Sequence, residues 1–199
     1  MAAPLPLRFV SSFACKNDMP TTRAEVALVG RSNVGKSSLL NVLAQNRKLA
    51  RTSKTPGATR LLNAYELEPE GSLRWIVDMP GYGYGQASKV DQSRWNAMAE
   101  EYLLRRESLG LVLHLIDAAV GPTQLDLKTV DWLNALNLSV NCIATKVDKI
   151  RPSRMHTRRR ELANKLDLQQ NSILWVSSTK KIGIPELRAH IVKLLKPAA

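Results

Sequence analysis

The segment GRSNVGKS at residues 30–37 constrains the fold of this chain more than any other feature. It is a full match to G-x-x-x-x-G-K-[S/T], the pattern of a phosphate-binding loop. An apolar run at 24–30 precedes it and predicts a buried strand, and a helical pattern at 36–45 follows it. A loop between a strand and a helix presents backbone N–H groups and a helix N-terminus to a polyphosphate. The placement therefore predicts an α/β nucleotide-binding fold.

Short apolar runs alternate with amphipathic stretches along the rest of the chain. Further strands are predicted at 61–68, 73–80, 109–117, 139–146 and 173–178. Further helices are predicted at 93–106, from Gly121-Pro122 to about residue 137, at 153–167 and at 185–195. This alternation favours a mostly parallel six-stranded sheet with helices on both faces, and the turn at Pro69 and Gly71 predicts one antiparallel strand at an edge. We expect a single α/β domain over 24–199 after an irregular lead-in at 1–23.

Composition narrows the possible partners and the cellular location. The 199 residues suit one domain, and 29 Lys and Arg against 17 Asp and Glu give a net charge of +12. That excess favours a polyanionic partner, nucleic acid before a membrane surface. Cys15 and Cys142 lack the spacing of a metal site or a disulfide scaffold. The start MAAPLPLRF lacks the apolar core of a signal peptide, and no apolar run is long enough to span a membrane, so we expect a cytoplasmic location and no membrane partner. A monomer is expected as well, although nothing in the sequence determines the oligomeric state.

The phosphate loop assigns a role to particular side chains. Lys36 is the predicted catalytic cation at the β and γ phosphates, and the Ser37 hydroxyl is a predicted Mg²⁺ ligand. The segment DMPG ends a predicted strand, where Asp78 can hold Mg²⁺ through water and the Gly81 N–H can contact a γ-phosphate. The nucleotide contacts expected from these two segments are Gly30, Arg31, Ser32, Asn33, Val34, Gly35, Lys36, Ser37, Asp78, Met79, Pro80 and Gly81.

The choice of base depends on TKVD, which follows a predicted strand and so lies at the carboxyl edge of the sheet. The Asp148 carboxylate can accept hydrogen bonds from the N1–H and the exocyclic amine of guanine. Adenine would present an acceptor there and leave the charge unpaired. The predicted base contacts are Thr145, Lys146, Val147 and Asp148, with the Lys146 stem over the base plane, and Ser177, Ser178 and Thr179 after the last strand.

Segments with family character occur in a fixed order along the chain. They are GRSNVGKSSLLN (30–41), LARTSKTPGATR (49–60), DMPGYGYG (78–85), ATKVDK (144–149) and SSTKK (177–181). Together they resemble the EngB (YihA/YsxC) family of ribosome-assembly GTPases, in the TrmE–Era–EngA–EngB–Septin class. The resemblance runs from about residue 8 to the end. It implies a single P-loop G domain that binds GTP and Mg²⁺, a role in maturation of the large ribosomal subunit, and an association with cell division and septation.

The resemblance also implies a first switch segment. Its expected nucleotide contacts are Gly57, Ala58, Thr59, Arg60 and Leu61. Thr59 would complete the Mg²⁺ shell, and Thr55 is a competing candidate by its distance along the chain from Ser37. Residue 145 is Thr where most GTPases carry Asn, which leaves base selectivity with Asp148.

Hydrolysis is predicted to be slow, because Tyr82 stands where Ras-like enzymes carry the Gln that orients the attacking water. In related GTPases the position of Asn33 coordinates K⁺ beside the phosphates, so Asn33 is a candidate K⁺ ligand; the alternative is that it only shapes the loop. Two other functions stay open at this point. One is a P-loop small-molecule kinase, and the other is a nucleotide-gated RNA- or protein-binding module with negligible hydrolysis.

A basic run, RPSRMHTRRR at 151–160, follows the predicted base-recognition segment. Further Lys and Arg occur at 47, 48, 51, 54, 180 and 181. This clustering predicts contact with rRNA phosphates and a steep dependence of binding on salt. The remaining aromatic candidates, Trp75, Trp95, Trp132, Trp175 and the strand residue His114, are predicted to pack in or near the core.

Overall fold

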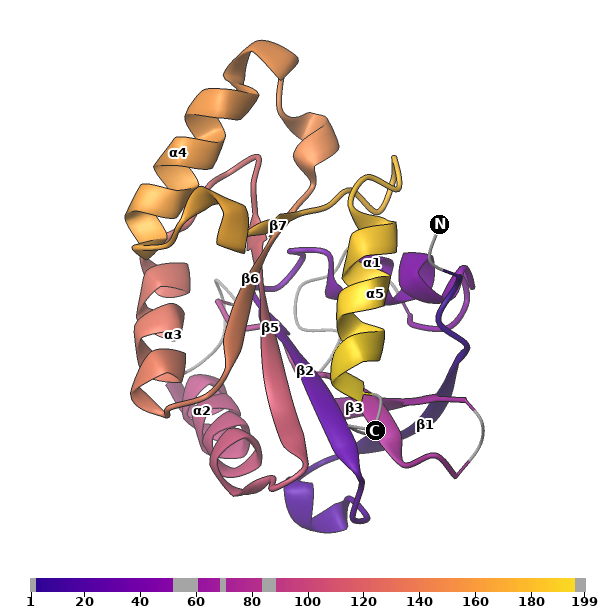
Figure 1. Cartoon of the computed structure of the whole chain (residues 1–199). Helices are drawn as coiled ribbons and strands as arrows, with labels where there is room; N and C mark the ends of the chain where they lie inside the picture. The colour runs from indigo at the N-terminus through magenta and orange to yellow at the C-terminus, as the bar shows by residue number, and fades with distance from the viewer. Residues whose placement is uncertain (1–2, 52–60, 69–70, 84–88, 196–199) are drawn as a thin grey trace.

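The computed structural model describes residues 3–51, 61–68, 71–83 and 89–195, and of residues 89–92 and 94–96 it describes the backbone only. A seven-stranded sheet with the order β1-β3-β4-β2-β5-β6-β7 forms its centre (Figure 1). The strands are β1 (Leu7–Phe13), β2 (Ala24–Gly30), β3 (Leu62–Leu67), β4 (Arg74–Asp78), β5 (Leu109–Asp117), β6 (Val140–Thr145) and β7 (Leu174–Trp175). Strands β4, β2, β5, β6 and β7 are parallel to one another, whereas β3 is antiparallel to both of its neighbours, β1 and β4.

Strand β1 corrects the sequence prediction of six strands and an irregular lead-in. It takes the edge position, so the antiparallel strand β3 lies one place further in. The pairing of β1 with β3 is interrupted between Phe9 and Ser11 by a register shift. A bulge of this kind breaks the alternation of apolar and polar residues, which is the signal that a strand prediction uses.

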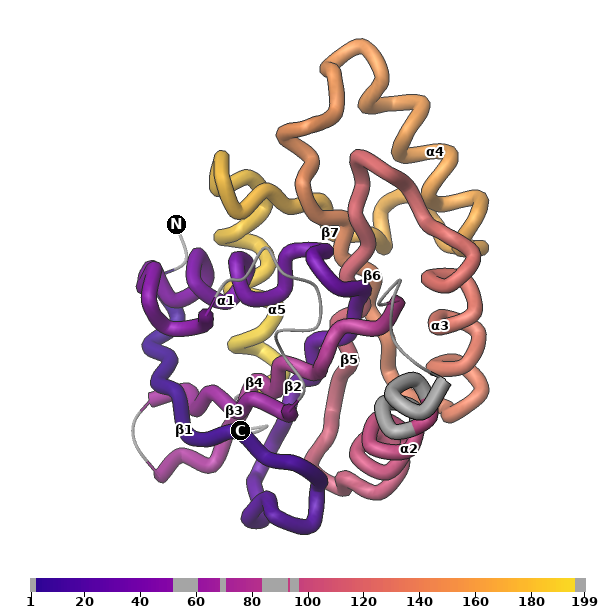
Figure 2. Tube along the Cα trace, turned by 180° about the vertical axis from the view of Figure 1, so that it is seen from behind, coloured from indigo at the N-terminus to yellow at the C-terminus, as the bar shows by residue number. Residues whose placement is uncertain are grey.

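Helices cover both faces of the sheet. They are α1 (Lys36–Ala44), α2 (Lys89–Arg105), α3 (Gln124–Ala135), α4 (Met155–Leu166) and α5 (Ile184–Leu195). Figures 1 and 2 show α1 and α5 on one side of the strands and α2 and α3 on the other. Successive residues of β2 alternate between these layers, since Val26 and Leu28 pack in the α1–α5 core while Ala27 and Val29 pack in the α2–α3 core.

Most predicted elements lie within a few residues of the observed ones, and β5 has the predicted bounds. The last strand is shorter than predicted, because only Leu174 and Trp175 pair with β6. Trp75 is buried, and Trp132 and Trp175 are half-buried, as expected of packing residues. Among the helices that the structure describes, none is long and apolar enough to cross a membrane.

Helix α1, which follows the phosphate loop, is anchored at its far end by α5. The buried Arg188 donates from Nε to the Leu43 carbonyl at 2.9 Å and from its terminal nitrogen to the Val42 carbonyl at 2.7 Å. Carbonyls in the last turn of a helix lack intrahelical partners, and a cation there is favourable. The phosphate loop therefore leads into a helix that is fixed at its opposite end.

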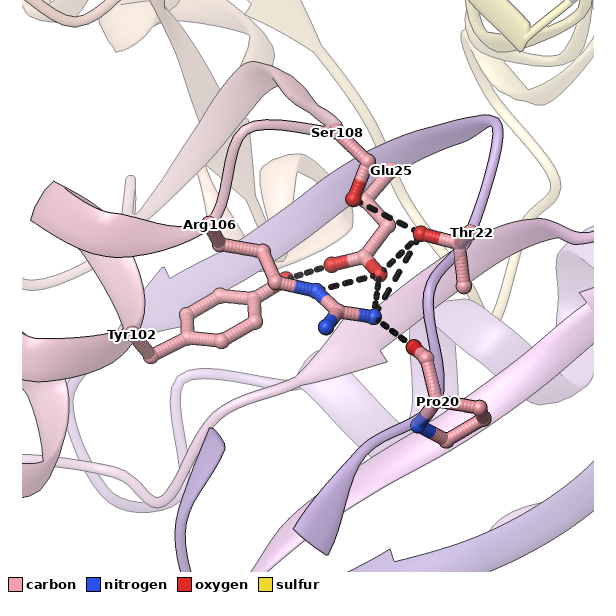
Figure 3. Close-up of polar contacts among 6 residues, drawn as sticks. All are labelled: Pro20, Thr22, Glu25, Tyr102, Arg106 and Ser108. Atoms are coloured by element: carbon pink, nitrogen blue, oxygen red, sulfur yellow. Dashed lines mark hydrogen bonds and ion pairs between the residues drawn. The ribbon is translucent and has the colours of Figure 1, made fainter. Parts of the chain in front are cut away.

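A buried ionic network lies at the N-terminal end of β2, opposite the end that leads into the phosphate loop (Figure 3). Glu25 is 1% exposed and accepts hydrogen bonds from Thr22 Oγ1 at 2.5 Å, from Tyr102 at 2.7 Å and from Arg106 Nε at 2.8 Å. Arg106 also donates to the Pro20 carbonyl, and Thr22 contacts the Ser108 hydroxyl. This cluster, called the Glu25 network below, joins the lead-in to β2 with the segment between α2 and β5, and both carboxylate oxygens of Glu25 have partners.

Candidate functional site

The predicted phosphate loop connects β2 to α1 at the carboxyl edge of the parallel strands. Gly35 immediately precedes the helix with φ of 115°, and Asn33 has φ of 62°. The value at Gly35 is strained for any residue with a Cβ, so glycine is needed there. Asn33 has an exposed side chain and belongs to one of the few residue types that tolerate this region. The loop thus has the conformation that the sequence pattern predicts.

Lys36 lies at the base of this loop. It is 8% exposed, and its Nζ donates to the Gly30 carbonyl at 3.2 Å. None of the ion pairs found among the described residues includes Lys36. Burial lowers the pKa of its ammonium group, and the charge of Asp78 opposes that shift. A buried ammonium held by one neutral carbonyl is only partly compensated, and an anion would complete it.

Asp78, at the end of β4, is the complementary charge. It is 1% exposed; its Oδ1 is buried and has no hydrogen-bond partner among the described residues, and its Oδ2 lies 3.5 Å from the Ser37 hydroxyl. Burial raises the pKa of this carboxyl to about 6, although Lys36 and the Ser37 hydrogen bond act in the opposite direction. A carboxylate and a hydroxyl oxygen side by side are hard ligands of the kind that Mg²⁺ prefers. These residues therefore fit a bound Mg²⁺.

The DMPG segment packs directly on the phosphate loop. Ser32 N–H donates to the Tyr82 carbonyl at 2.9 Å, and a Cβ at Gly81 would lie 2.7 Å from the Ser32 nitrogen. Only glycine allows this approach of the two backbones. Met79, a predicted nucleotide contact, has its side chain in the α2–α3 core, so any contact with a ligand would use its backbone. The buried side chains of Val34 and Val147 impose the same limit.

Thr145, the last residue of β6, contacts both the phosphate loop and β5 at this edge of the sheet. Its hydroxyl lies 2.8 Å from the Val34 carbonyl of the phosphate loop and 3.1 Å from the Ile116 carbonyl of β5, so its single hydrogen can be donated to either, with the Val34 carbonyl the nearer acceptor. The residue is 4% exposed. Thr in place of the usual Asn therefore retains a direct link between the base-recognition segment and the phosphate loop.

The next residues of that segment are held by side chains from neighbouring strand ends. Lys146 has φ of 57°, and its Nζ donates to the Asn33 carbonyl and to Asp117 Oδ2, both at 2.7 Å. Asp148 Oδ1 accepts a hydrogen bond from Ser177 Oγ at 2.5 Å. Asp117 was not among the predicted site residues. It is the last residue of β5, and its place at the end of a predicted strand was the available signal, whereas its contact with Lys146 depends on the pairing of β5 with β6.

The first switch segment lies outside the described residues. This applies to Gly57, Ala58, Thr59, Arg60 and the competing Thr55, and Lys54 lies there as well. Leu61 is described and is 40% exposed, one residue before β3. The structure therefore describes two parts of the predicted site. One is the phosphate loop with the DMPG segment, and the other is the base-recognition segment with Ser177.

Comparison with known proteins identifies the family. A family model described as 50S ribosome-binding GTPase matches residues 25–146. A probable GTP-binding protein EngB of Myxococcus xanthus is 45% identical over 188 residues, which are 92% of this chain and 91% of that protein. The chain belongs to the EngB family of GTP-binding proteins. This membership confirms the resemblance seen in the sequence and separates the chain from small-molecule kinases.

Solved structures agree with an EngB-type G domain. A crystal structure of a probable GTP-binding protein EngB superposes with a TM-score of 0.69, covers 86% of this chain and 98% of its own, and is 21% identical, which supports the fold. A crystal structure of Era in complex with MgGDPNP and nucleotides 1506–1542 of 16S ribosomal RNA also has a TM-score of 0.69. That protein is 28% identical, and the match covers 90% of this chain and 59% of Era.

Proposed function

We propose that this EngB-family chain binds GTP with Mg²⁺, hydrolyses it slowly, and acts as a nucleotide-dependent switch in assembly of the large ribosomal subunit in the cytoplasm. The observation that carries the nucleotide part is the pair of buried, incompletely compensated charges Lys36 and Asp78. They lie beside a loop whose backbone is shaped for phosphate. A triphosphate with its cation supplies both missing partners at once.

The metal would be held by Ser37 Oγ and by Asp78, the latter through water, with Thr59 of the first switch as the third protein contact. When bound, Mg²⁺ neutralises charge on the phosphates and orients them. The chain itself supplies Lys36 as a cation for the β and γ phosphates and the Gly81 N–H as a contact for the γ-phosphate. Lys36 is thus the proposed catalytic residue.

Base recognition is proposed for Asp148, with Lys146 over the base. Ser177 orients the Asp148 carboxylate, and Asp117 together with the Asn33 carbonyl holds Lys146. We expect GTP to displace a fluorescent GDP analogue and ATP not to do so. Asp148→Ala should remove this preference, and Asp148→Asn should shift it toward xanthine nucleotides, because an amide donor matches the carbonyl that xanthine carries. Equal affinity of wild type for adenine and guanine nucleotides would refute the proposal.

Slow hydrolysis is proposed because the side chain of Tyr82 is buried among core residues, where it cannot orient an attacking water. A K⁺ ion beside Asn33 is the proposed substitute for the missing group, since the Asn33 side chain is exposed at the rim of the loop. Turnover should be faster in KCl than in NaCl, and Asn33→Ala should abolish the difference. Equal turnover in the two salts would remove K⁺ from the mechanism.

The ribosomal part rests on charge and on the family. Exposed cations flank the base-recognition residues, and we call this set the basic surface: Lys149, Arg151, Arg154, Lys180 and Lys181. Two other arginines of the predicted run have partners in the protein. Arg158 pairs with Glu161 at 3.6 Å, and Arg159 lies over the Trp175 ring at 5.4 Å. The basic surface therefore combines Arg151 and Arg154 of the run with Lys149, Lys180 and Lys181 beside it, and these exposed cations are the ones proposed to meet rRNA phosphates.

Cosedimentation with immature and mature large subunits tests this part. Binding under a non-hydrolysable GTP analogue should exceed binding under GDP and should weaken steeply with salt. Arg151→Gln with Arg154→Gln should reduce binding, whereas Arg23→Gln with Arg105→Gln removes the same charge from exposed positions elsewhere and should leave binding unchanged.

Single-turnover hydrolysis with and without the particles separates a switch from a binding module with negligible hydrolysis. Equal loss in both double variants, or a flat salt titration, would refute the assigned surface. The family's association with cell division and septation is proposed to follow from this role.

A further inference from the structure

Tyr82 is bonded by its hydroxyl to two buried polar residues. The hydroxyl lies 2.6 Å from His114 Nε2 on β5 and 2.9 Å from Asp126 Oδ1 on α3. Tyr82 is 5% exposed, His114 is 0% exposed and Asp126 is 2% exposed. The side chain that occupies the position of the usual catalytic Gln is thus an anchor in the protein interior.

The direction of these hydrogen bonds follows from Asp126. Its Oδ2 already accepts from the Thr123 N–H at 2.8 Å and from the Thr123 hydroxyl at 2.7 Å, in the capping box that begins α3. Because an ionised carboxylate only accepts, the Tyr82 hydroxyl donates to Asp126, and His114 Nε2–H donates to the Tyr82 oxygen. His114 Nδ1 then carries no hydrogen and is an acceptor, and no donor meets it within the part of the chain that the structure describes.

The backbone of the same residue is bonded to the phosphate loop. The Tyr82 carbonyl accepts from Ser32 N–H, and Arg31 and Tyr82 form an isolated parallel bridge. Gly81 is pressed against Ser32 by this pairing, and within the described residues its own N–H forms no backbone hydrogen bond. Fixing the Tyr82 side chain therefore fixes the place of the Gly81 amide beside the loop.

We propose that Tyr82, held by His114 and Asp126, is a positioning residue that sets the Gly81 N–H for the γ-phosphate and so determines the affinity for GTP relative to GDP. The inference rests on the proposed function, in which Gly81 contacts the γ-phosphate. The contacts of the phosphate loop with the α and β phosphates are shared by the two nucleotides. A residue that acts only through Gly81 changes the affinity for GTP and leaves the affinity for GDP unchanged.

The test measures the dissociation constants of GDP and of a non-hydrolysable GTP analogue for a set of variants. Tyr82→Phe removes the hydrogen bonds to both His114 and Asp126, whereas His114→Leu removes only the first of them. Each should weaken the analogue about tenfold or more while GDP stays within about twofold. His114→Gln keeps a side-chain N–H donor and should retain the wild-type ratio of the two constants.

The matched control is Tyr102→Phe. It removes a buried hydroxyl that also donates to a carboxylate, at 2.7 Å from Glu25, in the network shown in Figure 3. It should lower the melting temperature as Tyr82→Phe does, without changing the nucleotide ratio. An unchanged ratio in Tyr82→Phe, or an equal change in Tyr102→Phe, overturns the inference. If Tyr82→Phe does not fold, the pair His114→Leu and His114→Gln decides the question by the same ratio. Failure of the wild type to bind either nucleotide would instead refute the proposed function.

Discussion

The two ends of strand β2 differ in how their buried charges are paired. At the start of the strand, Glu25 accepts hydrogen bonds on both oxygens, and Arg106 lies 2.6 Å away as its ionic partner. Beyond its end, within the residues described, Lys36 donates to one neutral carbonyl and Asp78 has one oxygen without a partner. Glu25, Lys36 and Asp78 are buried, and the Arg106 side chain is 10% exposed, so exposure alone does not distinguish the two pairs.

The difference separates a structural ionic cluster from a ligand site. Burying a charge without partners costs several kcal/mol, whereas a fully hydrogen-bonded pair offsets that cost. At one end of β2 the buried charges have a full set of hydrogen bonds and an ion pair, and at the other end they do not. An incomplete set of partners is expected where a bound ligand supplies the rest. Here the incomplete charges have the signs that a phosphate and a divalent cation would compensate.

The largest expected effect is on the stability of the protein, from a substitution at the end of β2 where the buried charges are fully paired. Glu25→Ala leaves Arg106 buried without its carboxylate and should lower the free energy of unfolding by about 4 kcal/mol. Urea denaturation measures this, and the GDP dissociation constant of the folded protein should stay within about twofold of the wild-type value. Loss of nucleotide affinity with full stability would reverse the assignment of the two ends.

A substitution among the incompletely paired charges should instead change nucleotide affinity much more than stability. Lys36→Met removes a cation that forms no ion pair among the described residues, although the Asp78 charge lies close enough to oppose the lowering of its pKa. The free energy of unfolding should therefore fall by much less than in Glu25→Ala. Nucleotide affinity should fall about 100-fold, because a charge-assisted contact with phosphate contributes about 3 kcal/mol. Titration with a fluorescent GDP analogue and urea denaturation on the same sample provide both numbers. A stability loss as large as that of Glu25→Ala would show that Lys36 is structural.

His114 gives a third case, a buried titratable group that is held neutral. Burial lowers its pKa to about 4 from the ordinary 6.5, against the opposing charge of Asp126. The unfolded chain therefore binds a proton that the folded chain does not, between these two values. Stability is full above the ordinary pKa and falls as the pH decreases through this window, by about 2 kcal/mol at about pH 5. Urea denaturation of wild type and His114→Gln at both ends of the window isolates the contribution, and parallel pH profiles would contradict it.

The smallest effect tests the link between the base-recognition segment and the phosphate loop. Thr145→Val keeps the side-chain shape but removes the hydroxyl that bonds the Val34 carbonyl. GDP affinity should fall about fivefold, as expected for one hydrogen bond of about 1 kcal/mol. Calorimetric titration measures it, with Thr145→Ser as the control that keeps the hydroxyl. Identical affinities of the Val and Ser variants would show that the link does not matter.

The sequence predicted those parts of the molecule that local pattern determines. The phosphate loop, strand β5 and helix α5 lie where periodicity and motif spacing placed them. Strand β1 was missed because its bulge interrupts the alternation, and its place at the edge depends on pairing with β3, more than 50 residues away at Ser12 and Asn63.

The tertiary contacts in the site also could not be predicted from the sequence. Tyr82 was recognised as a departure from the usual Gln, yet its bonds to His114 and Asp126 join residues 32 and 44 positions apart. Asp117 and Lys146 are 29 positions apart and meet because β5 and β6 are adjacent in the sheet. Spacing along a chain shows which residue types are present, while the pairing of strands decides which of them touch.

The bond from Lys146 to the Asn33 carbonyl has a consequence for how a nucleotide is received. It ties the segment that would face the base to the loop that would face the phosphates by a contact within the protein itself. The ordering of these two segments relative to each other is thus completed during folding, and binding need not repeat it. A nucleoside without phosphates should accordingly meet a base site that is already formed, and weak but guanine-selective binding of guanosine is the expected trace of that preorganisation.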